Sequence, residues 1–210
     1  MNKETLRVFV LFGNSASSIR YLSQHDPNFG LKYEIVGALT DNVVASAIKF
    51  FCEINNHCEI FPHRGLMISS RKKYYKKIKI IIDSYKPDLI ICSGWMWIIA
   101  EPLLSSYAGK IINVHPADLS IVSEEGIPKY RGKNAVEKAI LSGERELRST
   151  IHYVSKEVDC GKIICLSPHI FHVQLNKTPN WHQEQMKLIC DGPAMRFALE
   201  KLTSKVPQNS

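Results

Sequence analysis

The feature that most constrains the fold of this chain is a series of short, predominantly apolar runs without regular alternation. They occupy residues 6–12, 33–39, 88–93 and 110–115, and segments with helical signals separate them. A strand with one face in water alternates apolar and polar residues, whereas a strand covered on both faces is apolar throughout. The pattern therefore predicts an α/β fold in which a mostly parallel sheet carries helices on both faces.

Two side chains are placed to cap helices that flank this sheet. Asp41 follows the second apolar run and is expected to begin a helix that continues to about Cys52. Asn134 is expected to begin another helix that ends near Leu141, before a Ser-Gly pair.

The pattern changes toward the end of the chain. Residues 149–154 alternate in polarity, which predicts an antiparallel strand, and residues 162–171 are expected to form its hairpin partner. A single amphipathic helix is expected over 181–201. We expect one domain over residues 1–202 and a flexible tail over 203–210.

Composition excludes several classes of protein. Of the 210 residues 45% are apolar, enough for a core, but no apolar run approaches the ~18 residues of a membrane span. The N-terminus lacks the features of a secretory signal, so we expect a cytoplasmic protein. The net charge of +7 is concentrated in residues 71–79. That segment is either a solvated helix face or a surface that attracts an anion such as a phosphate, a polyglutamyl tail or RNA.

The cysteines give no sign of a metal site or a disulfide framework. They contain no C-x-x-C pair, and no cluster of Cys and His has the spacing of zinc ligands. In a reducing compartment we interpret them as small buried apolar residues. They are Cys52, Cys58, Cys92, Cys160, Cys165 and Cys190.

The chemistry is indicated by an amide and an imidazole at the end of one apolar run. Asn113 and His115 lie two residues apart, so in a strand their side chains share a face. Pro116 cannot continue the hydrogen-bond ladder, which ends the strand there. With the carboxylate of Asp159, these groups could stabilise an oxyanion and move a proton, as acyl-group transfer requires.

Each of these residues also has a structural interpretation. Asn113 could cap or turn the chain, His115 could satisfy backbone groups at a strand end, and Asp159 suits a hairpin turn. Only their occurrence together favours a catalytic role. The other histidines, His152 among them, show no pairing in the sequence and receive no role.

With these elements in place, the chain resembles the folate-dependent formyltransferases. The likeness rests on motifs whose order and spacing match the family between Lys86 and Cys165. They are residues 86–96 (KPDLIICSGWM), 107–116 (YAGKIINVHP), 130–132 (YRG), 150–154 (TIHYV) and 157–164 (EVDCGKII). The resemblance implies a Rossmann-like sheet with its site at the carboxyl ends of the strands. It also implies formyl transfer from 10-formyltetrahydrofolate to a primary amine, with no metal.

The resemblance also implies roles for individual residues. The catalytic set maps onto Asn113, His115 and Asp159. The folate-enclosing loops map onto 96–99 and 156–159, and the folate-binding residues are Arg71, Met96, Trp97, Ile98, Ile99, Glu157 and Val158. The acceptor-binding residues are Gly13, Asn14, Ser15, Ala16, Ser17, Ser18 and Gly132.

The chain departs from the family on the acceptor side. The phosphate-binding loop, a G-S-N sequence in the relatives that act on a nucleotide, reads Ala16-Ser17-Ser18 here, although Gly13 and Asn14 lie just before it. Leu188 occupies the place of an acidic residue on the last helix, with Glu184 and Asp191 nearby, and residues 117–120 read ADLS where the family favours SLLP.

Two acceptors therefore stay open. Glycinamide ribonucleotide, an intermediate of purine (IMP) synthesis, is the first expectation, and an amino sugar carried on a nucleotide is the alternative. In either case we expect a small, phosphate-bearing amine as the partner. We expect neither a nucleic acid nor a membrane as a partner, and a monomer or homodimer.

Overall fold

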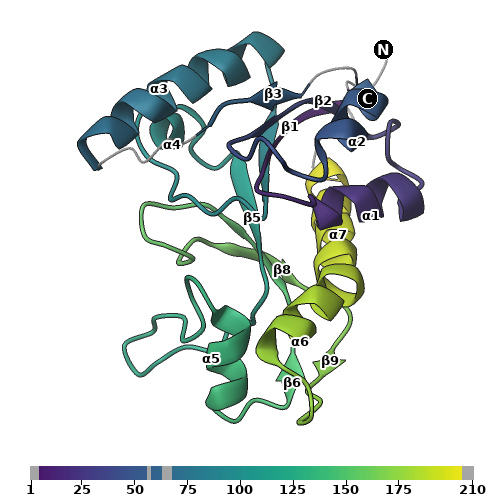
Figure 1. Cartoon of the computed structure of the whole chain (residues 1–210), viewed down its shortest axis with the longest axis vertical. Coiled ribbons are helices and arrows are strands. Elements are labelled where there is room, and N and C mark those ends of the chain that lie inside the picture. Colours follow the sequence, from purple (N-terminus) through teal and green to yellow (C-terminus); the bar gives the residue numbers. More distant parts are fainter. Residues whose placement is uncertain (1–4, 56–57, 63–67, 205–210) are drawn as a thin grey trace. The chain divides into compact units, whose positions relative to one another are not determined.

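The computed structural model describes residues 5–55, 58–62 and 68–204, which fall into two compact units (Figure 1). The first unit contains the chain up to Ala16 together with Pro27–Ile112. The second unit contains Ser17–Asp26 and the chain from Asn113 onward. The strand order is β3-β2-β1-β4-β5-β7-β8, and β5 is divided between the two units.

The first unit is built on parallel strands. Strand β1 pairs in parallel with β2 on one side and β4 on the other, and β2 pairs in parallel with β3. The strands are β1 (Leu6–Phe12), β2 (Tyr33–Thr40), β3 (Glu59–Ile60), β4 (Leu89–Ser93) and the start of β5 (Ile111–His115). The helices are α2 (Ile48–Asn55), α3 (Ile68–Tyr85) and α4 (Leu103–Ser106).

The centre of this sheet is closed to water. Residues 8–12 of β1 and Ile90 and Ile91 of β4 are fully buried. Val10 lies between Ala38 of β2 and Ile91 of β4 in the strand register. Burial on both faces explains why residues 8–12 of β1 and 89–92 of β4 are all apolar. The prediction of a mostly parallel sheet flanked by helices is confirmed.

The second unit joins antiparallel strands to the last helices. Strand β7 pairs antiparallel with β8, and β6 pairs with β9 in a separate two-stranded sheet. The strands are β6 (Glu146–Leu147), β7 (Thr150–Tyr153), β8 (Ile163–Leu166) and β9 (Phe171–His172). The helices are α1 (Ser17–His25), α5 (Ala135–Leu141), α6 (Pro179–Met186), the π-helical turn η1 (Lys187–Asp191) and α7 (Gly192–Ser204).

The C-terminal elements differ in detail from the prediction. The expected partner strand over 162–171 is two strands, because the chain leaves β8 at Leu166 and pairs again only as β9. The expected single helix over 181–201 begins earlier, at Pro179, where Thr178 Oγ1 accepts from Trp181 N. It is interrupted by η1, and α7 extends to Ser204.

The predicted cap at Asp41 is wrong, whereas Asn134 occupies the predicted N-cap position without a capping hydrogen bond from its side chain. Helix α2 begins at Ile48, and the Asp41 carboxylate instead accepts a hydrogen bond from the indole N–H of Trp97. Asn134 does precede α5, but its backbone is left-handed (φ 59°) and its side chain makes no capping hydrogen bond. The Asp41 side chain therefore contacts the loop after β4 rather than a helix terminus.

The cysteines are only partly as expected. Cys92, Cys165 and Cys190 are buried and all six are free thiols, but Cys52, on α2, is exposed. No helix of the described residues is long and apolar enough to cross a membrane.

Candidate active site

Strand β5 delivers Asn113 and His115 to the second unit on one face, as its period of two requires. His115 is buried and Asn113 half-buried. The segment that follows is held against β7 by Thr150, whose hydroxyl donates to the Ala117 carbonyl (2.6 Å) and accepts from Leu119 N (3.0 Å). These bonds fix the chain where it leaves the strand.

Asp159 reaches the same place from the loop after β7. Its backbone is left-handed (φ 54°), a conformation that Asp and Asn adopt more readily than most residues. At Gly161 a Cβ would lie 1.7 Å from the Tyr153 carbonyl oxygen, so only glycine lets the loop fold back onto the end of β7. The carboxylate side chain is 12% exposed.

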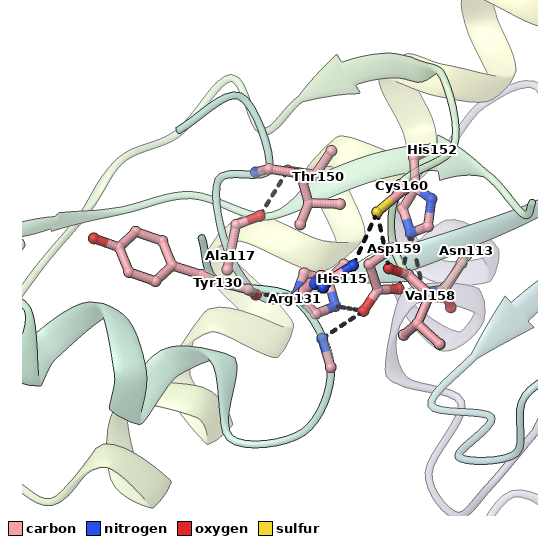
Figure 2. A network of polar contacts seen from close by, with 12 residues as sticks. Asn113, His115, Ala117, Tyr130, Arg131, Thr150, His152, Val158, Asp159 and Cys160 are labelled. Carbon is pink, nitrogen blue, oxygen red and sulfur yellow. Dashed lines mark hydrogen bonds and ion pairs between the residues drawn. The ribbon is translucent and has the colours of Figure 1, made fainter. Parts of the chain in front are cut away.

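Two imidazole nitrogens and one backbone N–H surround the Asp159 carboxylate (Figure 2). His115 Nδ1 lies 3.4 Å from Oδ2, and His152 Nε2 lies 3.4 Å from Oδ1. The backbone N–H of Gly132 donates to Oδ2 at 2.7 Å. Asn113, His115, Gly132 and Asp159 are thus brought together within one unit.

This arrangement keeps Asp159 ionised. Burial alone would raise the pKa of the carboxyl, but the hydrogen bond from His152, the charge of His115 and the Gly132 N–H together lower it from 3.8 to about 2. A carboxylate with so low a pKa holds a proton poorly. It is suited to orienting and stabilising a charged imidazole.

His115 is engaged at both ring nitrogens. Nε2 lies 2.7 Å from the Tyr130 carbonyl oxygen, which can only accept, so Nε2 carries a proton and Nδ1 faces Asp159. Burial lowers the pKa of His115, and the charge of Asp159 opposes that effect. A second proton on Nδ1 would face the carboxylate, so Asp159 favours the charged ring.

His152 is the residue that sequence reasoning missed. Its Nδ1 lies 3.0 Å from the Tyr153 carbonyl oxygen, and its Nε2 lies 3.3 Å from the Asn113 amide nitrogen and 3.4 Å from Asp159 Oδ1. The contact with Asn113 fixes the orientation of its amide and leaves the second N–H of that amide for another partner. The only sequence signal was that His152 lies inside the TIHYV motif, because strand register cannot be seen in one sequence.

Two further side chains lie at the edge of this cluster. The Arg131 guanidinium lies 3.5 Å from Cys160 Sγ, and the thiol in turn donates to the Val158 carbonyl. Glu157 and Val158, expected at the folate site, are both exposed on the same loop.

The expected acceptor loop is engaged in contacts of its own. In the first unit the Gly13 carbonyl accepts from Asn42 Nδ2 (3.2 Å), and Asn14 Oδ1 accepts from Ser46 N (3.0 Å). Ser15 is half-buried, and Ala16 is buried with a left-handed backbone (φ 46°). In the second unit Ser17 and Ser18 form the first turn of α1, with Ser18 fully buried.

The expected folate residues of the first unit form an exposed apolar loop. Met96, Trp97 and Ile98 are 62%, 39% and 46% exposed, whereas Ile99 is buried. Arg71 is half-buried on α3.

On the last helices, the three side chains of interest have different surroundings. Leu188 is 64% exposed, Glu184 pairs with Lys187 (2.5 Å), and Asp191 is buried and accepts from the Ser149 hydroxyl. Within residues 5–55, 58–62 and 68–204, no three His, Cys, Asp or Glu side chains gather so that they could hold a metal ion.

Comparison with known proteins agrees with this geometry. The chain is 25% identical over 164 residues to the trifunctional purine biosynthetic protein adenosine-3 of Homo sapiens, covering 77% of this chain and 15% of that protein. It is 34% identical over 95 residues to phosphoribosylglycinamide formyltransferase of Escherichia coli (strain K12), covering 45% and 41%. The matches thus span well under two thirds of these curated relatives.

A solved structure covers nearly the whole chain. Phosphoribosylglycinamide formyltransferase of Coxiella burnetii, in complex with CHES, superimposes with a TM-score of 0.78 at 26% identity, over 96% of this chain and 88% of that one. The model of the formyl transferase family matches residues 7–180, which include Asn113, His115, His152 and Asp159. The chain therefore belongs to the formyl transferase family.

Proposed function

We propose that this chain transfers a formyl group from 10-formyltetrahydrofolate to a primary amine, glycinamide ribonucleotide, in purine synthesis in the cytoplasm. The family match and the printed names of the relatives support the reaction. The observation that carries it is the Asp159 carboxylate, shared by two imidazoles beside a held amide.

Asn113 is the group we assign to the formyl oxygen. When an amine attacks a formyl group, negative charge develops on that oxygen, and a fixed N–H donor stabilises it. Both nitrogens of His115 face protein atoms in this arrangement, whereas Asn113 has one amide hydrogen beyond its contact with His152. This differs from the expectation that His115 would also donate to the oxygen.

The proton that leaves the amine is assigned to His115 and Asp159. The neutral ring carries its proton on Nε2, so Nδ1 can accept one, directly or through a water. That proton can then pass to the folate nitrogen as the bond between this nitrogen and the formyl carbon breaks, which releases tetrahydrofolate. The resulting imidazolium would face the ionised Asp159 at 3.4 Å, which stabilises its charge. His152 is a positioning residue, because it orients the Asn113 amide and stabilises the charge of Asp159.

The residues expected to hold the folate fit its chemistry. The exposed apolar side chains of Met96 and Ile98 and the Trp97 ring offer a surface that a flat pterin could cover. Arg71 supplies a cation for a carboxylate, and its helix is joined to this loop by the hydrogen bond from Trp95 Nε1 to Tyr75 OH (3.2 Å). The donor supplies the formyl group when bound.

A nucleotide-linked amino sugar is the second candidate acceptor. Two features favour it: the exposed apolar Leu188 stands in the place of the family's acid, and Asn14 Oδ1 is engaged by the backbone N–H of Ser46. These features concern the binding of the acceptor and leave the residues assigned to formyl transfer unchanged.

The test is a turnover assay with 10-formyltetrahydrofolate and each acceptor, following tetrahydrofolate formation. We expect turnover with glycinamide ribonucleotide and none without an amine. Turnover only with the amino-sugar nucleotide would select the second candidate. Release of tetrahydrofolate at equal rates with and without any amine would contradict formyl transfer.

A further inference from the structure

The segment Tyr130–Gly132 contacts the catalytic cluster through three consecutive residues. The Tyr130 carbonyl accepts from His115 Nε2 (2.7 Å), and the Gly132 N–H donates to Asp159 Oδ2 (2.7 Å). Between them, the Arg131 guanidinium lies 3.5 Å from Cys160 Sγ, the neighbour of Asp159 in the chain (Figure 2). Its positive charge is therefore held at the edge of the reacting groups.

Arg131 has an unusual set of partners for an arginine in a fixed position. A thiol sulfur is a weak acceptor. Among the described residues, no carboxylate oxygen lies within 4.0 Å of the Arg131 guanidinium, the limit for an ion pair. Arg7 shows the contrast, because its guanidinium donates to Glu34 Oε1 (3.1 Å) and to two backbone carbonyls. The exposed guanidinium of Arg131 is thus available to an anion.

Neighbouring charges favour an anion rather than a cation at this place. Lys138 Nζ donates to the Arg131 carbonyl (2.9 Å), and the Lys138 charge also acts on His115, where it disfavours the charged ring. The nearby negative charge of Asp159 is already matched by two imidazoles and the Gly132 N–H. Arg131 and Lys138 therefore place two cations at this edge of the cluster.

We propose that Arg131 binds a phosphate group of the acceptor and so selects phosphate-bearing amines. The inference rests on the proposed formyl transfer, which places the acceptor amine beside Asp159. A guanidinium matches a phosphate with two parallel hydrogen bonds, which fixes both position and orientation. The loop at 13–18, where the phosphate was expected, instead uses Asn14 Oδ1 to accept from Ser46 N.

The first test compares two acceptors in two variants. Glycinamide ribonucleotide and its dephosphorylated nucleoside are assayed with the wild-type enzyme, with Arg131→Gln, and with Lys129→Gln as a control that removes a charge from the same loop. We expect Arg131→Gln to lower kcat/KM for the ribonucleotide about 10- to 100-fold, through KM, and to leave the nucleoside within about 2-fold. Lys129→Gln should change neither, and the KM for the folate donor should stay constant in all three proteins.

The second test needs no turnover. Ribose 5-phosphate is titrated calorimetrically into the three proteins, and we expect about 10-fold or more weaker binding to Arg131→Gln alone. If the wild type does not formylate glycinamide ribonucleotide but binds ribose 5-phosphate through Arg131, the proposed function fails and the phosphate site stands.

Three outcomes would overturn the proposal. The first is that the wild type does not bind ribose 5-phosphate, and the second is that Arg131→Gln binds it as tightly as the wild type does. The third is that Arg131→Gln loses kcat/KM equally for both acceptors, which would place Arg131 at the reacting oxygen instead. Arg131→Lys keeps the positive charge but lacks the paired N–H donors of the guanidinium. It serves as the test variant if Arg131→Gln does not fold. We expect it to bind the phosphate with intermediate affinity.

Discussion

At the scale of residues, Asp159 organises the site because every one of its contacts favours the charged form. Moving the pKa of a carboxyl from 3.8 to about 2 corresponds to about 2 kcal/mol of interaction with the ionised state. That free energy comes from two imidazoles and one backbone N–H, which belong to different segments of the chain. The carboxylate therefore links the geometry of His115 to that of His152.

Asp159→Asn tests the catalytic part of this role. Asn tolerates the left-handed backbone at this position, so we expect the variant to fold and to bind the folate donor. An amide cannot stabilise an imidazolium as a carboxylate does, so kcat should fall by about 10²- to 10⁴-fold.

Glu146→Gln, which removes an exposed carboxylate from β6, is the control and should leave kcat unchanged. Steady-state kinetics, with thermal melting as a check of folding, measure both variants. A fully active Asp159→Asn would exclude the proposed proton path.

At the scale of elements, the junction of η1 and α7 holds a second buried carboxyl. Asp191 is the last residue of the π-helical turn and accepts from the Ser149 hydroxyl, just before β7 begins. Burial raises its pKa from 3.8 to about 6, although the Ser149 hydrogen bond and Lys187 oppose the effect. Ionised Asp191 therefore destabilises the fold by about 3 kcal/mol above pH 6.

Asp191→Asn should relieve this cost. An amide oxygen still accepts from Ser149 and carries no charge, so we expect the free energy of unfolding at pH 8 to rise by about 1–3 kcal/mol. At pH 4, where the wild-type carboxyl is protonated, the gain should be small. Urea unfolding at both pH values measures the effect, with Glu200→Gln on the exposed side of α7 as the control. A variant less stable than the wild type at pH 8 would show that the charge is needed.

At the scale of the whole molecule, three buried groups set how stability depends on pH. Folded His115 has a lowered pKa, so as pH falls below 6.5 the unfolded chain takes up its proton first and stability decreases. Asp191 acts in the opposite direction, because between pH 6 and 3.8 the folded state binds the proton more tightly. Asp159 stabilises the fold above pH 3.8 and loses that contribution as pH falls toward 2.

We therefore expect a shallow change in stability between pH 6.5 and 4 and a steep loss of about 2 kcal/mol from Asp159 between pH 4 and 2. Unfolding free energies measured at steps of pH would show both parts. In Asp191→Asn the compensation is removed, so the decline should begin near pH 6.5. An undiminished stability of the wild type from pH 4 to pH 2 would contradict the low pKa of Asp159.

How much could be predicted from the sequence depends on how local the cause is. The parallel strands follow from apolar runs that are buried on both faces, as residues 8–12 are, and the shared face of Asn113 and His115 follows from the period of a strand. The predicted cap at Asp41 failed because a side chain in a loop takes whichever partner the fold brings near. For Asp41 that partner is Trp97, 56 residues away.

By itself, the sequence determined the α/β architecture, the end of β5 at Pro116, and the family to which its motifs belong. Only the tertiary structure decided that Asp159 is shared by two histidines, that Asn113 is held by His152, and that Arg131 lies at the cluster without a carboxylate partner among the described residues. The physical reason is that hydrophobic period and turn chemistry act over a few residues. The contacts of Asp159 instead depend on the register of β7 and on loops that meet only when the chain is packed.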